Sequence, residues 1–378
     1  MKILYVIDCR LDAGGAPLST SILANEMAQE HEVYILMPQT EESGNPQIHY
    51  IQLSSFKDSF PFIFTQPFKA LLLIWKIYKA VKKVSPDIIH AEMPRGARAL
   101  GVLKKMGLIN IPLIYTEREF VTGLRKRYQF LYRILVASPY DLIICLSNKA
   151  VPFWRKYRED GVVVIPNPGG KQFDSYSEKD RETAINQLEG YKADSLNVMF
   201  AGRYLKAKRW DLIEEIINYY NQICPKGKVH FHIAVIYNIT NDKEATNMIE
   251  RLQNKANITI YPNADTNRMS DLYYACDLHF ITSSVESFGR TAIEAMSRKC
   301  IVYSTDAGAI SETIGDRQCI LPPKADAFVR IISEYENDKV KIEKQSQKMY
   351  YRYQQLYTTK ANYEANMKEY IKLIGKDL

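Results

Sequence analysis

Short apolar runs alternate with longer amphipathic stretches along all 378 residues. Short, continuous apolar runs are typical of parallel strands that are buried on both faces. Stretches with apolar residues three and four apart, such as 68–84, 95–106 and 148–158, predict helices between the strands. We expect strands at 3–7, 33–37, 48–53, 88–90, 111–115, 142–146 and 162–165, and again at 197–201, 230–236, 258–261, 278–281, 301–304 and 319–321.

A break in this alternation indicates two domains. The loop Pro166-Asn167-Pro168-Gly169-Gly170 separates the two strand series, and a polar helical stretch at 178–188 follows it. Each series of alternating strands and helices predicts a doubly wound parallel sheet. We therefore expect an α/β protein with two Rossmann-like domains facing a cleft, the first at 1–170 and the second at 171–354. The tail from about residue 326 onward reads as helical.

Composition and charge place the chain among folded, soluble proteins. Hydrophobic residues make up 46% and charged residues 25% of the sequence, and its net charge is +7. Residues 57–133 hold 15 basic and 5 acidic side chains. Such a stretch attracts anionic surfaces, although it also fits the solvated faces of ordinary helices. Its aromatic and basic residues include Phe60, Phe62, Phe64, Phe68, Trp75, Lys76, Lys79, Lys82, Lys83, Arg125, Lys126, Arg127 and Arg133.

The cellular compartment follows from cysteine usage and hydropathy. The six cysteines are scattered, without a Cys-x-x-Cys pair, and we interpret them as reduced core residues. The apolar run at the N-terminus is too short for a signal peptide, and no run approaches about 18 apolar residues. We expect a cytoplasmic protein without a membrane-spanning helix.

The strongest chemical signal is the stretch from Ile281 to Met296. A strand ends near Ile281, a loop carries Glu286, and Gly289 precedes a helix that carries Glu294. Unpaired backbone N–H groups at a helix start suit a diphosphate, and a glycine there lets a ligand approach the backbone closely. The two carboxylates could accept hydrogen bonds from sugar hydroxyls. Each could also be a simple partner of the helix dipole.

Two further turns carry candidate residues, and each follows the first predicted strand of a domain. Arg203 and Lys208 come after the strand at 197–201, where they could neutralise phosphate charge, although a basic cluster there is also common on solvated surfaces. Gly14 and Gly15 follow the strand at 3–7. They form only part of the dinucleotide-binding fingerprint Gly-x-Gly-x-x-Gly. The missing fingerprint argues against a dinucleotide-dependent oxidoreductase.

Taken in their order along the chain, these motifs resemble those of a known family. The Gly-Gly turn, the Ile-Pro-Asn loop, Gly-Arg-x-x-x-x-Lys, and Glu-x-Phe-Gly-x-x-x-x-Glu-Ala-Met are similar to the retaining glycosyltransferases of family four, which have the GT-B fold. The segment 304–312, Ser-Thr-Asp-Ala-Gly-Ala-Ile-Ser-Glu, is close to the family's Asp-x-Gly-Gly-x-x-Glu. The resemblance runs from residue 3 to about 335.

The resemblance implies a role for each matched position. Glu286 would bind hydroxyls of the donor sugar and Glu294 those of the ribose, while Arg203 and Lys208 would hold the diphosphate. The nucleotide base would lie near the end of the strand at 258–261, and a C-terminal helix at about 355–378 would pack back on the first domain. The remaining donor contacts would come from the backbone of Ser287, Phe288 and Gly289 and, from the first domain, Gly14 and Gly15.

Two positions depart from the family pattern. The usual Thr-x-His reads Thr116-Glu117-Arg118 here, and the usual His-x-His reads His90-Ala91-Glu92. Arg118 cannot act as a base, but it could contact the donor or the acceptor. His90 could be a similar contact or a buried structural residue.

The expected activity is that of a metal-independent hexosyltransferase. The chain has no Asp-x-Asp and no metal-spaced set of ligands, so we expect fixed positive charge to stabilise the leaving diphosphate, without a metal or cofactor. The resemblance implies retention at the anomeric carbon, by front-face attack.

The motifs themselves do not specify the donor or the acceptor. UDP is the commonest donor nucleotide in the family. The basic first domain fits a lipid-linked or polymeric acceptor of a bacterial surface glycan, at the inner face of the membrane. No nucleic-acid partner is expected. A GT-B sugar-nucleotide epimerase and a basic polyanion-binding protein are the alternatives.

Overall fold

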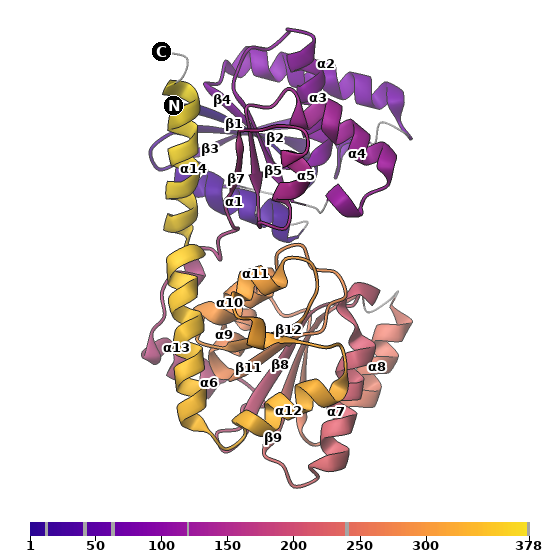
Figure 1. The fold of residues 1–378 in the computed structure, drawn as a ribbon, viewed down its shortest axis with the longest axis vertical. Helices are drawn as coiled ribbons and strands as arrows, with labels where there is room; N and C mark the ends of the chain where they lie inside the picture. Colours follow the sequence, from indigo (N-terminus) through magenta and orange to yellow (C-terminus); the bar gives the residue numbers. More distant parts are fainter. Residues whose placement is uncertain (12–13, 41–43, 62–64, 119–120, 239–241, 376–378) are drawn as a thin grey trace. The chain divides into compact units, whose positions relative to one another are not determined.

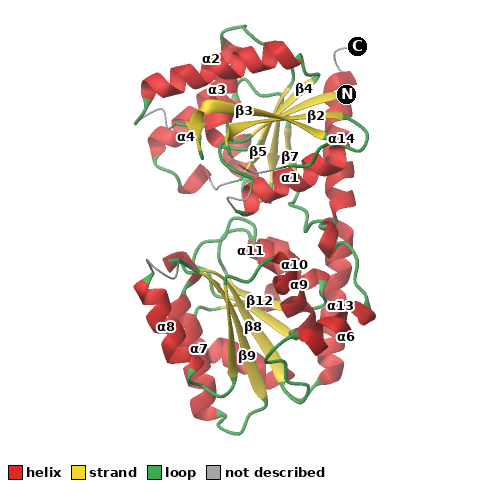
Figure 2. Cartoon of the chain, turned by 180° about the vertical axis from the view of Figure 1, so that it is seen from behind, coloured by secondary structure: helices red, strands yellow, loops and turns green. Residues whose placement is uncertain are grey.

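A computed structural model describes residues 1–11, 14–40, 44–61, 65–118, 121–238 and 242–375. The chain forms two compact units. Unit 1 contains residues 1–170 and 359–378, and unit 2 contains residues 171–358. The sequence places the first boundary at the same residue, Gly170. Helices cover both faces of the sheet in each unit (Figures 1 and 2).

Unit 1 is built on a seven-stranded sheet in the order β3-β2-β1-β4-β5-β6-β7, whose strands pair in parallel. The strand order reverses between β1 and β4, so the loops that leave these two strands diverge. The strands are β1 (Lys2–Val6), β2 (Glu32–Gln39), β3 (Ile48–Lys57), β4 (Ile88–Ala91), β5 (Leu113–Glu117), β6 (Leu142–Cys145) and β7 (Val162–Val164). The α-helices are α1 (Gly15–Met27), α2 (Pro67–Val84), α3 (Pro94–Lys105), α4 (Lys126–Tyr132), α5 (Val151–Arg155) and α14 (Thr359–Ile374), and a π-helical turn, Arg133–Ala137, follows α4.

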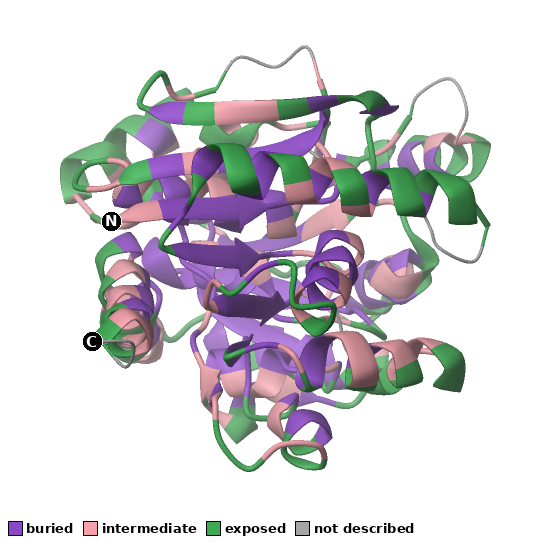
Figure 3. Cartoon of the chain, turned by 90° about the horizontal axis from the view of Figure 1, so that it is seen from above, coloured by how far each residue is buried: buried purple, intermediate pink, exposed green. Residues whose placement is uncertain are grey.

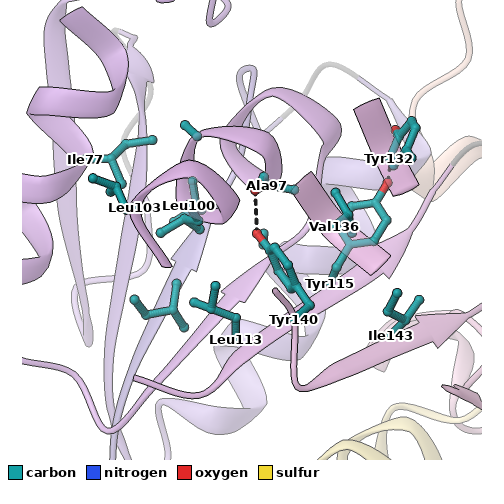
Figure 4. Close-up of a cluster of buried hydrophobic side chains, with 14 of the residues drawn as sticks. Ile77, Ala97, Leu100, Leu103, Leu113, Tyr115, Tyr132, Val136, Tyr140 and Ile143 are labelled. Carbon is teal, nitrogen blue, oxygen red and sulfur yellow. Dashed lines mark hydrogen bonds between the residues drawn. The ribbon is translucent and has the colours of Figure 1, made fainter. Parts of the chain in front are cut away.

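The core of unit 1 has two layers, one on each face of the sheet. Along β1, Leu4 and Val6 join the layer that contains residues of α2 and α3, whereas Ile3 and Tyr5 join the layer with α1 and α14. This alternation follows from strand geometry, and it explains why the apolar runs are continuous. Figure 4 shows part of the first layer, where the hydroxyl of Tyr140 donates to the carbonyl of α3 residue Ala97 at 2.8 Å. The central strands are buried along most of their length, as Figure 3 shows.

Unit 2 repeats the plan with a six-stranded parallel sheet in the order β10-β9-β8-β11-β12-β13, which reverses between β8 and β11. The strands are β8 (Leu196–Arg203), β9 (Val229–Ile236), β10 (Ile258–Pro262), β11 (Leu278–Ile281), β12 (Ile301–Thr305) and β13 (Ile320–Leu321). The α-helices are α6 (Glu178–Gln187), α7 (Trp210–Ile223), α8 (Lys243–Gln253), α9 (Thr266–Ala275), α10 (Arg290–Ser297), α11 (Ile310–Ile314), α12 (Ala325–Tyr335) and α13 (Lys339–Leu356).

The C-terminal helix α14 belongs to unit 1. Its Tyr370 is fully buried, 2.6 Å from Nδ1 of His90 and 3.1 Å from the hydroxyl of Tyr5, and Asn362 donates to the carbonyl of Pro166. The helix begins at Thr359, four residues after the expected 355, because α13 ends at Leu356 within unit 2. The predicted helix at 148–158 is also shorter, and its α-helical part is α5, with a proline in its first turn.

Within the described ranges no helix combines the length and the apolar character that crossing a membrane requires.

Candidate functional site

The point where the strand order reverses in unit 2 brings two loops together. The loop after β8 and the loop after β11 leave adjacent parallel strands. The amide of Ser284 donates to the carbonyl of Ala207 at 2.8 Å, and the hydroxyl of Thr282 donates to the carbonyl of Lys208 at 2.7 Å. These bonds fix one loop against the other. They therefore position the side chains that the two loops carry.

Lys208 and Glu286 meet at this point. Nζ of Lys208 lies 2.6 Å from Oε2 of Glu286, although 78 positions separate them in the chain. Their side chains keep 23% and 14% of their surface exposed, so a ligand from solvent can reach both. Gly202 lies beneath the aliphatic part of Lys208, since an added Cβ would be 3.6 Å from its carbons. The sequence predicted these two residues for one site, and the structure brings them into direct contact.

Arg203 takes a different place. Its backbone carbonyl accepts a hydrogen bond from the indole of Trp210 at 2.9 Å, and its side chain is exposed at the end of β8. There it lines an open hollow of about 590 Å³ together with Asn238 and Asn263, near the ends of β9 and β10. Arg203 and Lys208 were expected to flank one helix start. The structure instead places Arg203 on the β9–β10 side and Lys208 beside Glu286.

The loop before α10 is held by tight packing. Gly289, the residue before the helix, has a left-handed backbone with φ of 88°, and an added Cβ would lie 2.1 Å from Cδ1 of Ile310 on α11. Phe288 is buried against the ring of Tyr357, and its carbonyl accepts from the hydroxyl of Thr313 at 2.6 Å. The phenyl group is thus part of the core, so Phe288 can meet a ligand only through its backbone.

Glu294 lies on the second turn of α10, the helix on which the sequence placed it. Arg290 Nε is 2.8 Å from its Oε1, and the hydroxyl of Tyr273 donates to its Oε2 at 3.3 Å. Burial raises the pKa of the Glu294 carboxyl, against the opposing effects of Arg290 and Tyr273. Neither partner was predicted from the sequence. The four-residue spacing of Arg290 and Glu294 was a usable signal, whereas nothing local pointed to Tyr273 on α9.

In unit 1, His90 and Arg118 belong to one buried polar cluster. The ring nitrogens of His90 lie 2.6 Å from the hydroxyl of Tyr370 and 2.7 Å from that of Thr116, and burial lowers its pKa to about 4. Arg118 Nε donates to Oε2 of Glu92 at 2.9 Å. Its guanidinium also donates to the side chain of Asn167. This arrangement favours the structural alternative for His90, and it places Arg118 at the wall of a cavity that is described below.

The glycine pair lies at the corresponding point of unit 1, after β1. Gly14 has φ of 130° and precedes α1, which begins at the exposed Gly15. The two preceding residues of this turn, Asp12 and Ala13, lie outside the described residues. As for metals, no three His, Cys, Asp or Glu side chains form a group suited to an ion anywhere in the ranges that the structure describes.

The basic, aromatic stretch forms an exposed face on α2. Phe68, Leu71, Leu72 and Trp75 are exposed there at helical spacing, and the side chain of Phe68 keeps 85% of its surface in solvent. Lys79 Nζ lies 3.9 Å from the centre of the Trp75 ring. We call these residues, with the other lysines of α2, the α2 face. Two aromatics named from the sequence, Phe62 and Phe64, lie outside the described residues, and Phe60 is buried in the core and does not belong to this face.

Comparisons with known proteins cover both units. A model of the group 1 glycosyl transferases matches residues 181–355, and a model of glycosyltransferase family 4 matches residues 13–168. An uncharacterized 41.2 kDa protein in the cps region of Klebsiella pneumoniae is 23% identical over 332 residues, which is 84% of each chain.

Two solved structures share the fold along nearly the whole chain. HepE of Anabaena, in complex with UDP and glucose, has a TM-score of 0.74 at 17% identity and covers 98% of this chain and 99% of its own. Sucrose-phosphate synthase from Thermosynechococcus elongatus has a TM-score of 0.79 at 16% identity and covers 99% of both chains.

Proposed function

Because this chain belongs to the glycosyltransferases of family four, which have the GT-B fold, we propose that it transfers a hexose from a UDP-sugar to a glycan acceptor with retention of configuration. The contact between Lys208 and Glu286 carries the proposal. It joins a cation suited to phosphate and a carboxylate suited to sugar hydroxyls at the point where nucleotides bind to doubly wound sheets. The choice of UDP is supported by HepE, which was solved with UDP and glucose.

In this proposal the donor separates the ion pair. The backbone amides of the first turn of α10 point toward its N-terminal end, as in every α-helix, and this end lies next to the loop of Glu286. A diphosphate at this position would receive hydrogen bonds from them and charge from Lys208. Glu286 would then turn to hydroxyls of the sugar. Glu294, one turn along α10, would accept from the ribose, and Arg203 would contact the nucleotide from the hollow near β10.

The chemical step needs no group beyond donor and acceptor. The bond between the anomeric carbon and the diphosphate oxygen breaks, and the acceptor oxygen forms its bond to that carbon on the same face. The hydroxyl proton of the acceptor passes to the departing diphosphate. Lys208 and the helix amides stabilise the charge that develops on the diphosphate, which is the role that a metal fills in other transferases.

The test uses Lys208→Ala and Glu286→Ala in the full chain. Each change should lower kcat for release of UDP from the cognate UDP-sugar by about 100-fold or more, because it removes a group that stabilises or positions the transition state. Lys206→Ala is the matched control, since Lys206 is an exposed lysine of the same loop, two residues away. A thermal-shift panel of UDP, GDP and their sugars identifies the donor beforehand, because a ligand at 100 times its Kd adds about 2.7 kcal/mol.

The possible results separate the alternatives. Near-normal turnover in both alanine variants would contradict the site. Conversion of the UDP-sugar without any acceptor would indicate an epimerase instead. Unchanged turnover in the presence of a chelator is expected, and loss of turnover would contradict the metal-independent step.

We further propose that the acceptor is lipid-linked or polymeric and is met at an anionic membrane surface, on the inner face. The α2 face supports this. Helix α2 carries five lysines and no acidic residue, and its exposed apolar side chains lie among them. Lysines near an anionic bilayer contribute about 1 kcal/mol each, and exposed Phe and Trp side chains suit the headgroup region.

Vesicle binding tests the α2 face. Replacing Lys76, Lys79 and Lys83 with Gln should weaken sedimentation with vesicles that contain phosphatidylglycerol by at least tenfold, and Trp75→Ala should weaken it at high salt, where apolar contacts dominate. Lys149→Gln, a change of a lysine on another part of unit 1, serves as control. Equal binding by all variants would contradict the proposal.

A further inference from the structure

A cavity of about 370 Å³ lies inside unit 1, where β1 and β4 end. Apolar groups form much of its wall, among them Met93 and Leu124. Three arginines, Arg95, Arg98 and Arg118, also line it. Their positive charge lies within one cavity, so the partners of each guanidinium decide what the cavity can bind.

Two of these arginines have partners in the protein. Arg118 forms an ion pair with Glu92. Arg95 donates to the backbone carbonyl of Phe60. Arg98 differs, because it makes no hydrogen bond and no ion pair with any residue that the structure describes. Its guanidinium carbon lies 5.7 Å from the centre of the Tyr132 ring.

The burial of Arg98 makes this arrangement informative. Only 7% of its surface is exposed, and its side chain reaches the cavity wall. The guanidinium of Arg98 is therefore held at the cavity without an ion partner, and a guanidinium matches phosphate and carboxylate groups with two parallel hydrogen bonds. An anion in the cavity would supply the missing ion partner.

Asp8, a carboxylate that lines the same cavity, is already engaged. The oxygens of Asp8 accept from the amides of Arg95 at 2.6 Å and of Gly96 at 2.7 Å, at the start of α3. Asp8 therefore caps α3, and it feels Arg98 only through a weaker electrostatic effect. Because the first amides of α3 already donate to Asp8, an anionic ligand would be bound by guanidinium groups instead.

We propose that this cavity binds the phosphate or carboxylate group of the acceptor, with Arg98 as its ion partner and the apolar wall against the rest of the molecule. Naming the ligand as the acceptor rests on the proposed function, while the anion site itself does not. The proposal predicts that transfer prefers acceptors that carry an acidic group near the reacting hydroxyl. Neutral sugars would lack the main contact.

Two thiols make a direct test in the full chain. Cys9 lines the cavity and is partly exposed, whereas Cys224, also partly exposed, lies at the end of α7 in unit 2. Alkylation by N-ethylmaleimide, followed by peptide mass spectrometry, gives the rate at each thiol. Glucose 6-phosphate or glucuronate should slow alkylation of Cys9 at least threefold and leave Cys224 unchanged, and glucose should slow neither. The sugar that protects better distinguishes a phosphate from a carboxylate ligand. If neither protects Cys9 at 10 mM, a concentration chosen on the order of ten times a millimolar Kd, the proposal is wrong.

Variants connect the protection to Arg98. Arg98→Gln should abolish it, and Arg155→Gln, an exposed arginine of α5 outside the cavity, should preserve it. If Arg98→Gln does not fold, Leu124→Trp fills the cavity while Arg98 is kept, and protection should again be lost. Protection that persists in a folded variant of either kind overturns the assignment.

The outcome is separable from that of the proposed function. Binding of UDP is measured by thermal shift and depends on unit 2. A chain that binds UDP but shows no protection of Cys9 retains the donor site and loses the anion site. If Cys9 is protected but the chain transfers no sugar, the anion site is supported and the proposed function is contradicted.

Discussion

Replacing Gly289 with alanine tests the packing of the loop before α10. Two costs follow from the structure. A non-glycine residue with φ of 88° costs about 1 kcal/mol or more. The new Cβ would also lie 2.1 Å from Cδ1 of Ile310, well inside the usual carbon–carbon separation of about 3.5–4.0 Å. Overpacking of this kind costs about 1–3 kcal/mol, so we expect a loss of about 2–4 kcal/mol in total.

A second substitution separates the two costs. Ile310→Val removes the clashing carbon, and the next nearest atom, Cγ1 of Ile310, lies at an ordinary 3.5 Å. Alone, this change should cost about 0.5–1.5 kcal/mol. In the double variant the overlap disappears, so its destabilisation should fall short of the sum of the single changes by about 1–3 kcal/mol. Gly107→Ala is the matched control, because Gly107 has φ of 68° but open space around it, and it should show the backbone cost alone.

The free energies come from urea unfolding of the full chain, followed by circular dichroism. The chain has two units, so the transition of unit 2 is identified by its shift when UDP is added, and the cost of Gly107→Ala, which lies in unit 1, is taken from the other transition. If the destabilisation of the double variant equals the sum of the two single variants within about 0.5 kcal/mol, the contact between the loop and α11 is refuted. A cost for Gly107→Ala equal to that of Gly289→Ala would show that backbone strain alone explains the effect.

Two other predictions concern ionisable groups. Glu294→Gln should raise the KM for the donor about tenfold with little change in kcat, since a ribose contact is equal in ground and transition states; an unchanged KM in steady-state kinetics would contradict the ribose contact. Burial lowers the pKa of His90 and His279 to about 4 and that of His232 to about 3, so the unfolded chain binds more protons once the pH falls below about 6.5. Stability should therefore fall between pH 6.5 and 4, by up to about 1.4 kcal/mol per pH unit for each histidine, and a flat profile in urea unfolding at pH 4.5–7 would contradict this.

The sequence predicted the family and the fold correctly, for a physical reason. Strands buried on both faces need continuous apolar runs, and each predicted strand overlaps an observed one. Helix limits were less predictable, because packing decides them. The pattern at 148–158 gave only the short α5, and the helical turns of 126–137 carry too many charges and aromatics for a clear apolar stripe.

Part of the candidate site could be predicted from the sequence, and part could not. Motif spacing was enough to pair Lys208 with Glu286, because both follow strands that are neighbours in a doubly wound sheet. It could not show that carbonyl groups of one loop accept hydrogen bonds from Thr282 and Ser284 of the other. Both bonds are accepted by backbone carbonyl groups, which every residue has. They leave no signature in the identity of the residue that accepts.

The two departures from the family pattern need the structure for a different reason. Read separately, Glu92 and Arg118 each stand where the family pattern has a histidine. In the structure Nε of Arg118 donates to Oε2 of Glu92, and both side chains are almost fully buried. Removing one partner of a buried ion pair costs about 3–5 kcal/mol, so either residue would be unfavourable here without the other. The two departures are therefore one coupled change, which fixes a guanidinium at the wall of the cavity in unit 1 where the family pattern has a histidine. A position-by-position comparison cannot find this, because the coupling exists only once β4 and β5 lie side by side.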